Sequence, residues 1–406
     1  MNIVLEPGAA ALLDELHRAG FGAYAVGGCV RDSLLGLAPH DWDLCTAARP
    51  GQVMELFGED RCIPTGLQHG TVTVKRDGKL YEITTFRTEG RYSDGRHPDS
   101  VAFVPDLRED LARRDFTINA MAYSAEEGLC DPFGGREDLA RGVVRAVGEP
   151  LRRFGEDALR ILRLYRFAAR FGFAIDEATE AAAKQLASHL DCVSAERIEE
   201  ELNKLLAAPQ PGAYLEPEVL AFVLPELPPE ELTKARRRID ALPAGTEQVS
   251  ARWAALLLPL GETGARKALK RLKCSNARID GAVALVRECG EKTPDTLDKC
   301  DLRLQAKRLL GKYDLHTVRQ LTALWTALAP EEKASFDALR AEAEALTAQG
   351  VCCRISQLAV SGRDLMAAGA APGPGLRRVL EALLEEVITG RLPNEKTELL
   401  AFAAGF

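Results

Sequence analysis

The sequence predicts an α+β protein, in which an N-terminal head with a small mixed sheet precedes a long, all-helical extension. From residue 1 to about 148, helical and strand-like segments alternate along the chain. Beyond about residue 149 the strand pattern disappears, and Leu, Ala, Glu and Arg recur at helical spacing. With 406 residues and 46% hydrophobic content, the chain is long enough to bury the cores of about two to four units.

Each element of the head has a local signal. Residues 11–19 predict a short helix, and the apolar run 23–26 predicts a strand. Residues 71–75 and 81–86 alternate and are rich in β-branched side chains, which is typical of strands. The Asp77-Gly78 pair between them predicts a hairpin turn, because these residue types accept the positive φ angles that such turns need.

Proline and glycine clusters divide the helical extension. The clearest breaks fall at residues 207–218, 224–230 and 370–375. No internal repeat is visible, so we expect a helical extension of several unlike parts.

The net charge of −8 argues against indiscriminate binding of nucleic acid, although a local basic stripe can still hold a phosphate backbone. Residues 141–173 contain eight arginines against three acids, and residues 266–278 contain six basic residues and no acid. Each stripe is equally compatible with a solvated helix face.

Ten cysteines occur without a Cys-x-x-Cys pair, which excludes the usual zinc spacing and predicts reduced, buried thiols. Apolar runs such as 253–260 are too short to span a bilayer, and the N-terminus lacks the pattern of a signal peptide. We therefore expect a cytoplasmic protein without membrane contacts, whose oligomeric state the sequence leaves open.

The densest motif is YAVGGCVRDSLLG, residues 24–36. A strand that runs into two glycines allows a sharp reversal and close approach of a phosphate. A helix that starts just after them directs free N–H groups towards an anion, and Gly28 lies at that point. Arg31, one turn further on, can add charge-assisted hydrogen bonds to phosphate oxygens.

Asp41 and Asp43 lie two residues apart shortly afterwards, so on an extended segment both carboxylates project to one face. Hard oxygen ligands of this kind suit Mg²⁺, and a pair of such ions can activate a hydroxyl and stabilise a leaving oxygen. A lone Asp-x-Asp is common in surface turns, but the preceding Gly-Gly-x-x-Arg-Asp makes the pattern far more specific. Glu82 can serve as a third carboxylate, or it can pair with Arg87 or another basic residue.

These two motifs, in this order, resemble the signature of the polymerase-β-like superfamily, and specifically of the class II tRNA nucleotidyltransferase and bacterial poly(A) polymerase family. Further blocks that resemble the family follow in order: TGLQHGTV (65–72), RYSDGR (91–96), RRDFTIN (113–119), DPFGG (131–135), EDALR (156–160) and ERI (196–198). They cover about residues 20–206, and segments 361–375 and 392–400 also look family-like, whereas 208–350 match only in being helical.

The resemblance implies a polymerase-β-like catalytic head over 1–148 and a helical neck over 149–207 that recognises the nucleotide base. It further implies a helical body over 208–315 and a tail over 316–406, both binding RNA. Asp41 and Asp43 would be the catalytic ligands of Mg²⁺, and Gly28 and Arg31 would hold the triphosphate.

RRDFTIN resembles the family's ribose-recognition motif, in which Arg114 is the nucleotide contact. An Arg, an Asp and an Asn together can hold a 2′-hydroxyl, which both donates and accepts. The alternative interpretation is that the Arg and the Asp form an ion pair with a purely structural role.

In EDALR, Asp157 and Arg160 are three apart, so on one helix they would share a face. A carboxylate accepts hydrogen bonds and a guanidinium donates them. Such a pair matches the adjacent donor and acceptor groups that both cytosine and adenine present. Guanine and uracil present the reverse order and would leave both groups unpaired. Arg163 and Arg166 continue the spacing, and the resemblance implies that they contact the nucleotide; binding of the RNA backbone is the alternative.

The superfamily resemblance alone does not separate tRNA CCA addition from poly(A) synthesis. The segment 44–52 lacks the basic, aromatic stretch that poly(A) polymerases carry there, and the loop-like segment 88–98 resembles enzymes that can add the terminal A. We therefore expect template-independent addition of CCA to the 3′ end of tRNA from CTP and ATP. A-only addition and poly(A) synthesis remain the alternatives. An inactive RNA-binding protein would have lost a metal carboxylate, and an enzyme acting on a small molecule would not need the basic stripes.

Overall fold

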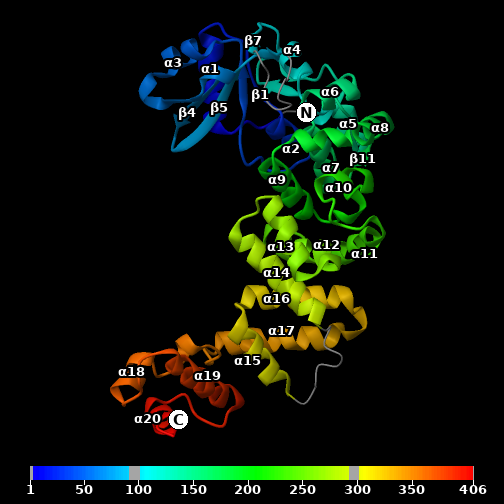
Figure 1. The fold of residues 1–406 in the computed structure, drawn as a ribbon. Coiled ribbons are helices and arrows are strands. Elements are labelled where there is room, and N and C mark those ends of the chain that lie inside the picture. The colour runs from blue at the N-terminus through cyan, green and yellow to red at the C-terminus, as the bar shows by residue number, and fades with distance from the viewer. Residues whose placement is uncertain (1–2, 91–100, 292–300, 406) are drawn as a thin grey trace. The chain divides into compact units, whose positions relative to one another are not determined.

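The computed structural model describes residues 3–90, 101–291 and 301–405, which form two compact units, 1–225 and 226–406 (Figure 1). The first unit contains the predicted head and the helices that follow it. The second unit is helical throughout its described residues. The α+β fold class is therefore confirmed. The boundaries expected after residues 148, 207 and 315 stay a prediction.

A seven-stranded mixed sheet lies at the centre of the head, with strand order β3-β4-β5-β2-β1-β8-β9. Its strands are β1 (Ala23–Val26), β2 (Leu44–Thr46), β3 (Cys62–Gly66), β4 (Thr71–Arg76), β5 (Lys79–Thr85), β8 (Ala122–Ser124) and β9 (Gly128–Cys130). Strands β2 and β5 run parallel, and the other neighbouring pairs are antiparallel. The central β1 is buried at all four positions, because it has neighbours on both edges and covered faces.

The local predictions for the head are confirmed. The expected strand at 23–26 is β1, and the hairpin is formed by β4 and β5. At its turn Asp77 and Gly78 have φ angles of 50° and 76°, the left-handed conformation that Asp-Gly favours. The helix expected from residue 11 begins earlier, at Pro7, because the Glu6 side chain accepts a hydrogen bond from the Ala9 N–H and caps it.

Helices surround the sheet, and a separate two-stranded ribbon lies beside it. The helices are α1 (Pro7–Arg18), α2 (Gly28–Leu34), α3 (Pro50–Phe57), α4 (Leu107–Ala112) and α5 (Gly135–Arg141), and the ribbon pairs β6 (Arg87–Glu89) with β7 (Val101–Phe103). Most of the expected loop at 88–98, including the RYSDGR block, lies outside the described residues.

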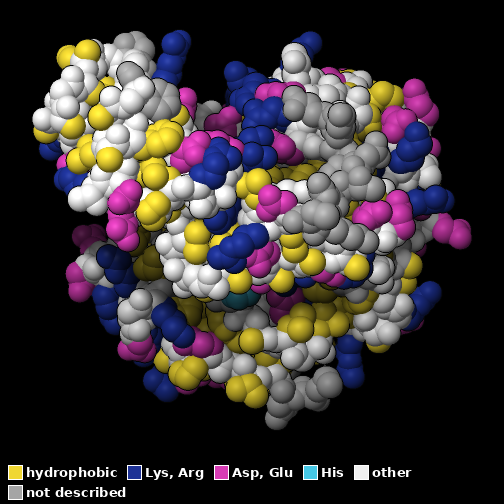
Figure 2. All heavy atoms as spheres, turned by 90° about the horizontal axis from the view of Figure 1, so that it is seen from below, with side chains coloured by type: hydrophobic (Ala, Val, Ile, Leu, Met, Phe, Trp, Pro, Cys, Tyr) yellow, Lys and Arg dark blue, Asp and Glu magenta, His cyan; other side chains and the backbone are white. Residues whose placement is uncertain are grey.

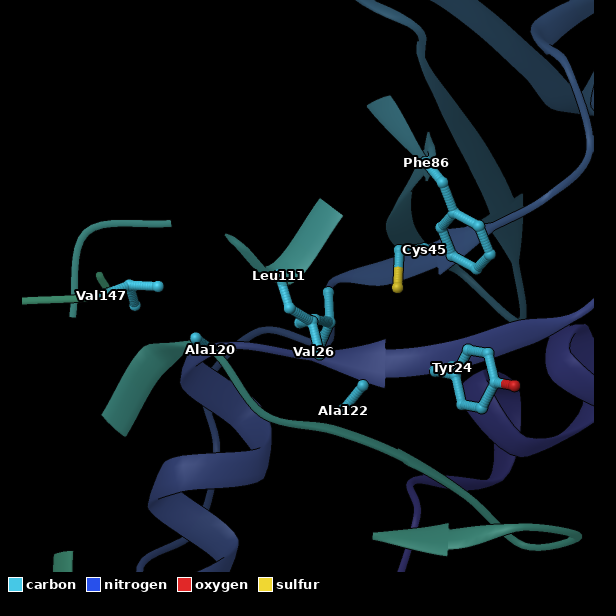
Figure 3. Packing of buried hydrophobic residues seen from close by; sticks show 8 residues of the cluster. All are labelled: Tyr24, Val26, Cys45, Phe86, Leu111, Ala120, Ala122 and Val147. Carbon is cyan, nitrogen blue, oxygen red and sulfur yellow. The ribbon is translucent and has the colours of Figure 1, made fainter. Parts of the chain in front are cut away.

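One buried cluster joins the strand before the glycines to the strand after the aspartates. Figure 3 shows Tyr24 and Val26 of β1 near Cys45 of β2, with Phe86, Leu111, Ala120, Ala122 and Val147 around them. All eight side chains are at most 7% exposed. Such dense packing fixes the two motif-bearing segments relative to each other, since interiors deform little.

Five helices complete the first unit: α6 (Pro150–Glu156), α7 (Leu159–Phe171), α8 (Glu177–Gln185), α9 (Ala195–Leu206) and α10 (Pro217–Val223). The expectation that strands end with the head is wrong in one detail. The two-residue β11 (Ala174–Ile175) pairs in parallel with β10 (Val143–Val144). Two residues are too few for an alternating pattern to be visible in a sequence.

The second unit contains ten α-helices among its described residues: α11 (Pro229–Asp240), α12 (Val249–Leu257), α13 (Gly261–Arg271), α14 (Asn276–Glu291), α15 (Leu302–Lys312), α16 (Leu315–Leu328), α17 (Lys333–Ala348), α18 (Gly362–Ala367), α19 (Pro374–Thr389) and α20 (Lys396–Ala403). Helix α12 is almost entirely buried and supplies Trp253 to the core. A smaller apolar cluster near the C-terminus contains Leu365, Leu383 and Leu399.

The nine cysteines within the described residues are free thiols, and six of them are buried. This agrees with the predicted reduced thiols; Cys300 lies outside the described residues. No described helix is both long and apolar enough to cross a membrane.

Candidate nucleotidyl-transfer site

The turn after β1 requires glycine at its first position. Gly27 has φ 78° and is the N-cap of α2. A Cβ atom there would lie 2.9 Å from NH1 of Arg114, so a side chain would be strained and would displace this guanidinium. At Gly28, the position expected to approach a phosphate, the added Cβ would lie 3.6 Å from NH2 of Arg31, an ordinary contact. The turn thus brings the glycines next to both motif arginines.

Asp41 and Asp43 immediately precede β2 and flank Trp42, which is 8% exposed. Because both aspartates are exposed and the residue between them is buried, their side chains project to the same side, as predicted. The parallel register that pairs Leu44 with Ile83 brings the preceding residues, Asp43 and Glu82, next to each other.

The pKa of Asp43 reflects this arrangement. Desolvation by the surrounding protein raises the pKa of its carboxyl, and the Arg114 charge opposes this, whereas the carboxylates of Glu82 and Asp41 raise it further. The ionised form of Asp43 would therefore be favoured by a nearby cation.

The donor set fits a hard divalent ion that keeps open positions. Among the described residues, no group of three His, Cys, Asp or Glu side chains is arranged to hold a metal ion. Asp41 and Asp43 would therefore supply two ligands and leave the rest to substrate phosphates and water, which is the preferred environment of a small hard ion. Glu82 lies beside Asp43, and the guanidinium of Arg87 donates a hydrogen bond to the carbonyl of His69.

The RRDFTIN segment, residues 113–119, is centred on Asp115, which is 7% exposed. Its Oδ1 accepts hydrogen bonds from the Phe116 N–H (2.8 Å) and Asn119 Nδ2 (3.0 Å). Its Oδ2 accepts from Nε (2.9 Å) and NH2 (2.7 Å) of Arg163 on α7. The Arg163 guanidinium and these hydrogen bonds hold the pKa of Asp115 well below its usual range, despite burial that acts to raise it.

Arg31 connects this motif to α2 and α7. It is 4% exposed and donates to Oδ1 of Asp32 (2.8 Å) and to Oδ1 of Asn119 (2.5 Å). Its guanidinium also lies over the rings of Phe167 and Phe171, 5.1 and 5.0 Å from their centroids. The side chain expected to hold phosphates is therefore enclosed between helices in this structure.

Asp157 and Arg160 do not lie on one continuous helix, so that expectation is wrong. Helix α6 ends at Glu156, Asp157 has the extended angles φ −145° and ψ 105°, and α7 begins at Leu159. Oδ1 of Asp157 accepts from the Leu159 N–H at 3.0 Å, so the aspartate caps the new helix. An Asp side chain competes in this way for backbone N–H groups, which is why it interrupts the helix.

The two residues consequently have different ionic partners. Arg160 donates to Glu156 Oε2 (2.7 Å) and to the carbonyls of Arg153 and Arg113 (3.1 Å each). Asp157 accepts from Arg197 on α9, at 3.3 Å and 2.8 Å.

Arg166 and Arg170 also have acidic partners. Nε of Arg166 lies 2.6 Å from Oε2 of Glu201, and burial lowers the pKa of Arg166 to about 10. Glu201 also lies 3.7 Å from Arg163. Arg170 lies 3.1 Å from Asp32.

Sequence reasoning missed the acids that hold these arginines, Glu156 and Glu201, and gave Arg197 no role. A signal existed for Glu201, which is 4% exposed. It occurs between Ile198 and Leu202 on the buried face of α9, where an acid needs a partner. Arg197 belongs to the ERI block at 196–198, but nothing in that block identifies Asp157 as its partner.

A mixed sheet with a Gly-Gly turn, a pair of exposed carboxylates and a helical extension defines a nucleotidyltransferase of the polymerase-β type. Family models agree: residues 23–145 match the model described as poly A polymerase head domain, residues 172–228 that described as probable RNA and SrmB-binding site of polymerase A, and residues 245–403 that described as tRNA nucleotidyltransferase domain 2 putative.

The chain is 38% identical to the CCA-adding enzyme of Limosilactobacillus fermentum, over 97% of this chain and 95% of that one. It is 37% identical to that of Geobacillus stearothermophilus, over 97% and 95%. The chain belongs to the family of CCA-adding enzymes.

Solved structures agree with this assignment. The Bacillus stearothermophilus CCA-adding enzyme in complex with CTP has a TM-score of 0.79 and 32% identity, over 99% of this chain and 98% of that one. The Thermotoga maritima CCA-adding enzyme complexed with tRNA_CCA has a TM-score of 0.70 at 22% identity, over 99% and 96%, and shares the fold.

Replacement of Asp115 with Asn should destabilise the protein by about 3 kcal/mol at pH 7, because it removes the buried charge that Arg163 pairs with. Since folding lowers the pKa of Asp115 from its ordinary 3.8, its stabilisation is present above about pH 4 and is lost as the pH falls towards the folded-state value. The difference between wild type and variant should therefore shrink below pH 4, as measured by urea unfolding at several pH values.

The control is Asp14→Asn, which removes an exposed surface pair with Arg18 and should change stability by less than about 0.5 kcal/mol. An Asp115→Asn protein as stable as wild type at pH 7 would contradict the importance of this carboxylate.

Proposed function

We propose that the chain adds C, C and A to the 3′ end of tRNA, without a template, from CTP and ATP. The observation that carries the proposal is that the carboxylates and the base-reading residues belong to one connected set. The Arg114 charge acts on Asp43, and the carbonyl of the adjacent Arg113 accepts a hydrogen bond from Arg160. Two residues further on, Asp115 binds Arg163 of the same helix. The relatives named CCA-adding enzymes support this function.

In the proposed reaction the 3′-hydroxyl of tRNA attacks the α-phosphate of the nucleotide. A new P–O bond forms, the bond to the β-phosphate oxygen breaks, and pyrophosphate leaves. Asp41 and Asp43 would hold Mg²⁺, which when bound favours ionisation of the hydroxyl and neutralises the leaving oxygen. Gly28, Arg31 and Arg114 would orient the triphosphate and the ribose. Positioning and charge stabilisation suffice for this chemistry.

Asp157 and Arg160 would select the base. Cytosine presents its N4 amino group beside N3, and adenine presents its N6 amino group beside N1. A carboxylate acceptor next to a guanidinium donor satisfies both, whereas guanine and uracil reverse the order. Each wrong base would leave a buried polar group unsatisfied, at a cost of about 1–3 kcal/mol. Arg163 and Arg166 would complete the nucleotide-binding surface.

The remaining helices would hold the tRNA, with the body over 208–315 and the tail over 316–406. Helix α13 offers positive charges for such a contact: Ala265, Ala268 and Leu269 are buried, while Lys267 and Lys270 are exposed. On the face in Figure 2, Lys and Arg side chains are interspersed with Asp and Glu rather than gathered in one patch. A contact between this face and the tRNA backbone would therefore use a few local positive charges. We also propose that the enzyme acts in the cytoplasm.

The decisive experiment supplies tRNA ending at the discriminator base, at C or at CC, each with CTP, ATP or both. A CCA-adding enzyme extends all three to the same CCA end and stops. Extension of only the CC-ended tRNA would identify an A-adding enzyme, and a long A tail would identify a poly(A) polymerase.

Replacement of Asp41 with Ala should lower the rate of nucleotide addition by about a thousandfold or more, because the metal contributes several kcal/mol to the transition state. Single-turnover assays would measure this loss, and the variant should bind tRNA as the wild type does. Glu55→Ala, which removes an exposed carboxylate on α3, should retain full activity. Full activity of the Asp41 variant would refute the metal assignment.

Replacement of Asp157 with Ala should relax base choice more than it slows CTP and ATP addition. Loss of the acceptor should reduce the preference for CTP over UTP by about 10- to 100-fold, which corresponds to one unsatisfied polar group. Asp157→Asn keeps the shape and should act in the same direction, since an amide can rotate to present a donor. Competition assays with radiolabelled nucleotides test this, and unchanged exclusivity for CTP and ATP would refute protein-directed base reading.

Replacement of both Lys267 and Lys270 with Ala should raise KM for tRNA and leave KM for CTP unchanged. The slope of log KM against log salt should fall by about 1 for each lysine that contacts a phosphate. Lys234→Ala on α11, whose ammonium is already paired with Glu231 at 2.9 Å, is the matched control. Equal effects of the control and the double variant would argue against a tRNA contact at α13.

A further inference from the structure

Arg197 contacts the base-reading carboxylate from a different helix. Its side chain extends from the first turn of α9 to the kink between α6 and α7. Both terminal nitrogens donate to Asp157, NH1 to Oδ1 at 3.3 Å and NH2 to Oδ2 at 2.8 Å. The two side chains are 22% and 15% exposed, so water competes only partly with this pair. A two-point contact of this kind fixes the plane of a carboxylate as well as its charge.

The hydrogen bonds use the two carboxylate oxygens unequally. Oδ1 of Asp157 accepts from both Leu159 N–H (3.0 Å) and Arg197 NH1. Oδ2 accepts only from Arg197 NH2 among the hydrogen bonds between described residues. Since each carboxylate oxygen offers about two acceptor positions, Oδ2 keeps one available for an incoming donor.

We infer that Arg197 is a positioning residue for base selection: it fixes the Asp157 carboxylate so that Oδ2 faces the exocyclic amino group of cytosine or adenine. This inference rests on the proposed function, in which Asp157 reads the base. Without Arg197, Asp157 would remain attached to the Leu159 N–H through one oxygen only, and its plane could rotate. A carboxylate that can turn away no longer penalises the carbonyl oxygen that uracil or guanine presents at that point.

The donor half of the base reader does not depend on Arg197. Arg160 is held by Glu156 and by the carbonyls of Arg153 and Arg113. Glu156 is itself held by Arg153 at 2.6 Å. Loss of Arg197 should therefore disturb only the recognition of the amino group, which is a narrower effect than loss of the fold around the nucleotide.

The test measures kcat and KM for CTP and for UTP, with tRNA ending at C as the acceptor and the full-length chain as the enzyme. Arg197→Met should reduce the preference for CTP over UTP by about tenfold or more, the size expected when a polar site loses its discriminating hydrogen bond. Most of the change should lie in KM for CTP and in increased use of UTP. Arg197→Lys, which can reach the carboxylate with a single ammonium, should give an intermediate preference.

Two comparisons separate positioning from general stabilisation. Lys204→Met, on the same helix and paired with the exposed Glu200 at 2.6 Å, should leave the preference unchanged. In an Asp157→Ala background, the additional Arg197→Met change should alter the preference by less than about twofold, since the group that it orients is gone. If Arg197→Met reduces the yield of folded protein, Arg197→Lys, alone and combined with Asp157→Ala, gives the same comparison.

The inference is overturned if Arg197→Met lowers kcat/KM for CTP and UTP by the same factor, or if its effect persists in the Asp157→Ala background. That result differs from failure of the proposed function, in which Asp157→Ala itself would leave the preference for CTP intact.

Discussion

The proposed nucleotide site depends on one interaction, the ion pair between the buried carboxylate of Asp115 and the guanidinium of Arg163. An ionised carboxylate can remain in an interior only when charge-assisted hydrogen bonds replace its water. Here four donors do so, from Phe116, Asn119 and two nitrogens of Arg163. Asn119 in turn accepts from Arg31. One acid therefore connects the ribose motif, the helix that follows the glycine turn and the helix that carries the arginines.

Buried charges are paired in the same way along α7. Arg160, Arg163 and Arg166 are three residues apart, and each is matched to an acid from a different element: Glu156 of α6, Asp115 before the 3-10 turn at 117–119, and Glu201 of α9. Three like charges on one buried helix face would repel one another without these partners. Acids from three different elements thereby fix α7 in place.

Patterns that are local in sequence were predictable. The alternation in β4 and β5, the Asp-Gly turn and the placement of Asp41 and Asp43 on one side of Trp42 each depend on a few neighbouring residues. Partners far apart in sequence were not. Arg163 and Asp115 are separated by 48 positions, and Arg197 and Asp157 by 40, and no local pattern specifies such pairs.

The helix break at Asp157 is a further feature that the sequence pattern did not predict. Periodicity alone favours one helix across 150–171, and only the competition of the Asp side chain for the Leu159 N–H ends α6.

This break also resolves a difficulty in the idea of a protein that reads bases with one acid and one arginine. Had Asp157 and Arg160 shared a helix face, their charges would have paired with each other, and each would have satisfied the other instead of a base. The kink separates them and gives each its own counterion, Arg197 for the acid and Glu156 for the guanidinium. Both charges are then neutralised by partners other than each other, so in the proposed function the acid and the guanidinium are each fixed before a base arrives. A fixed pair of this kind costs little to reorganise when a nucleotide enters, which is what a template made of side chains requires.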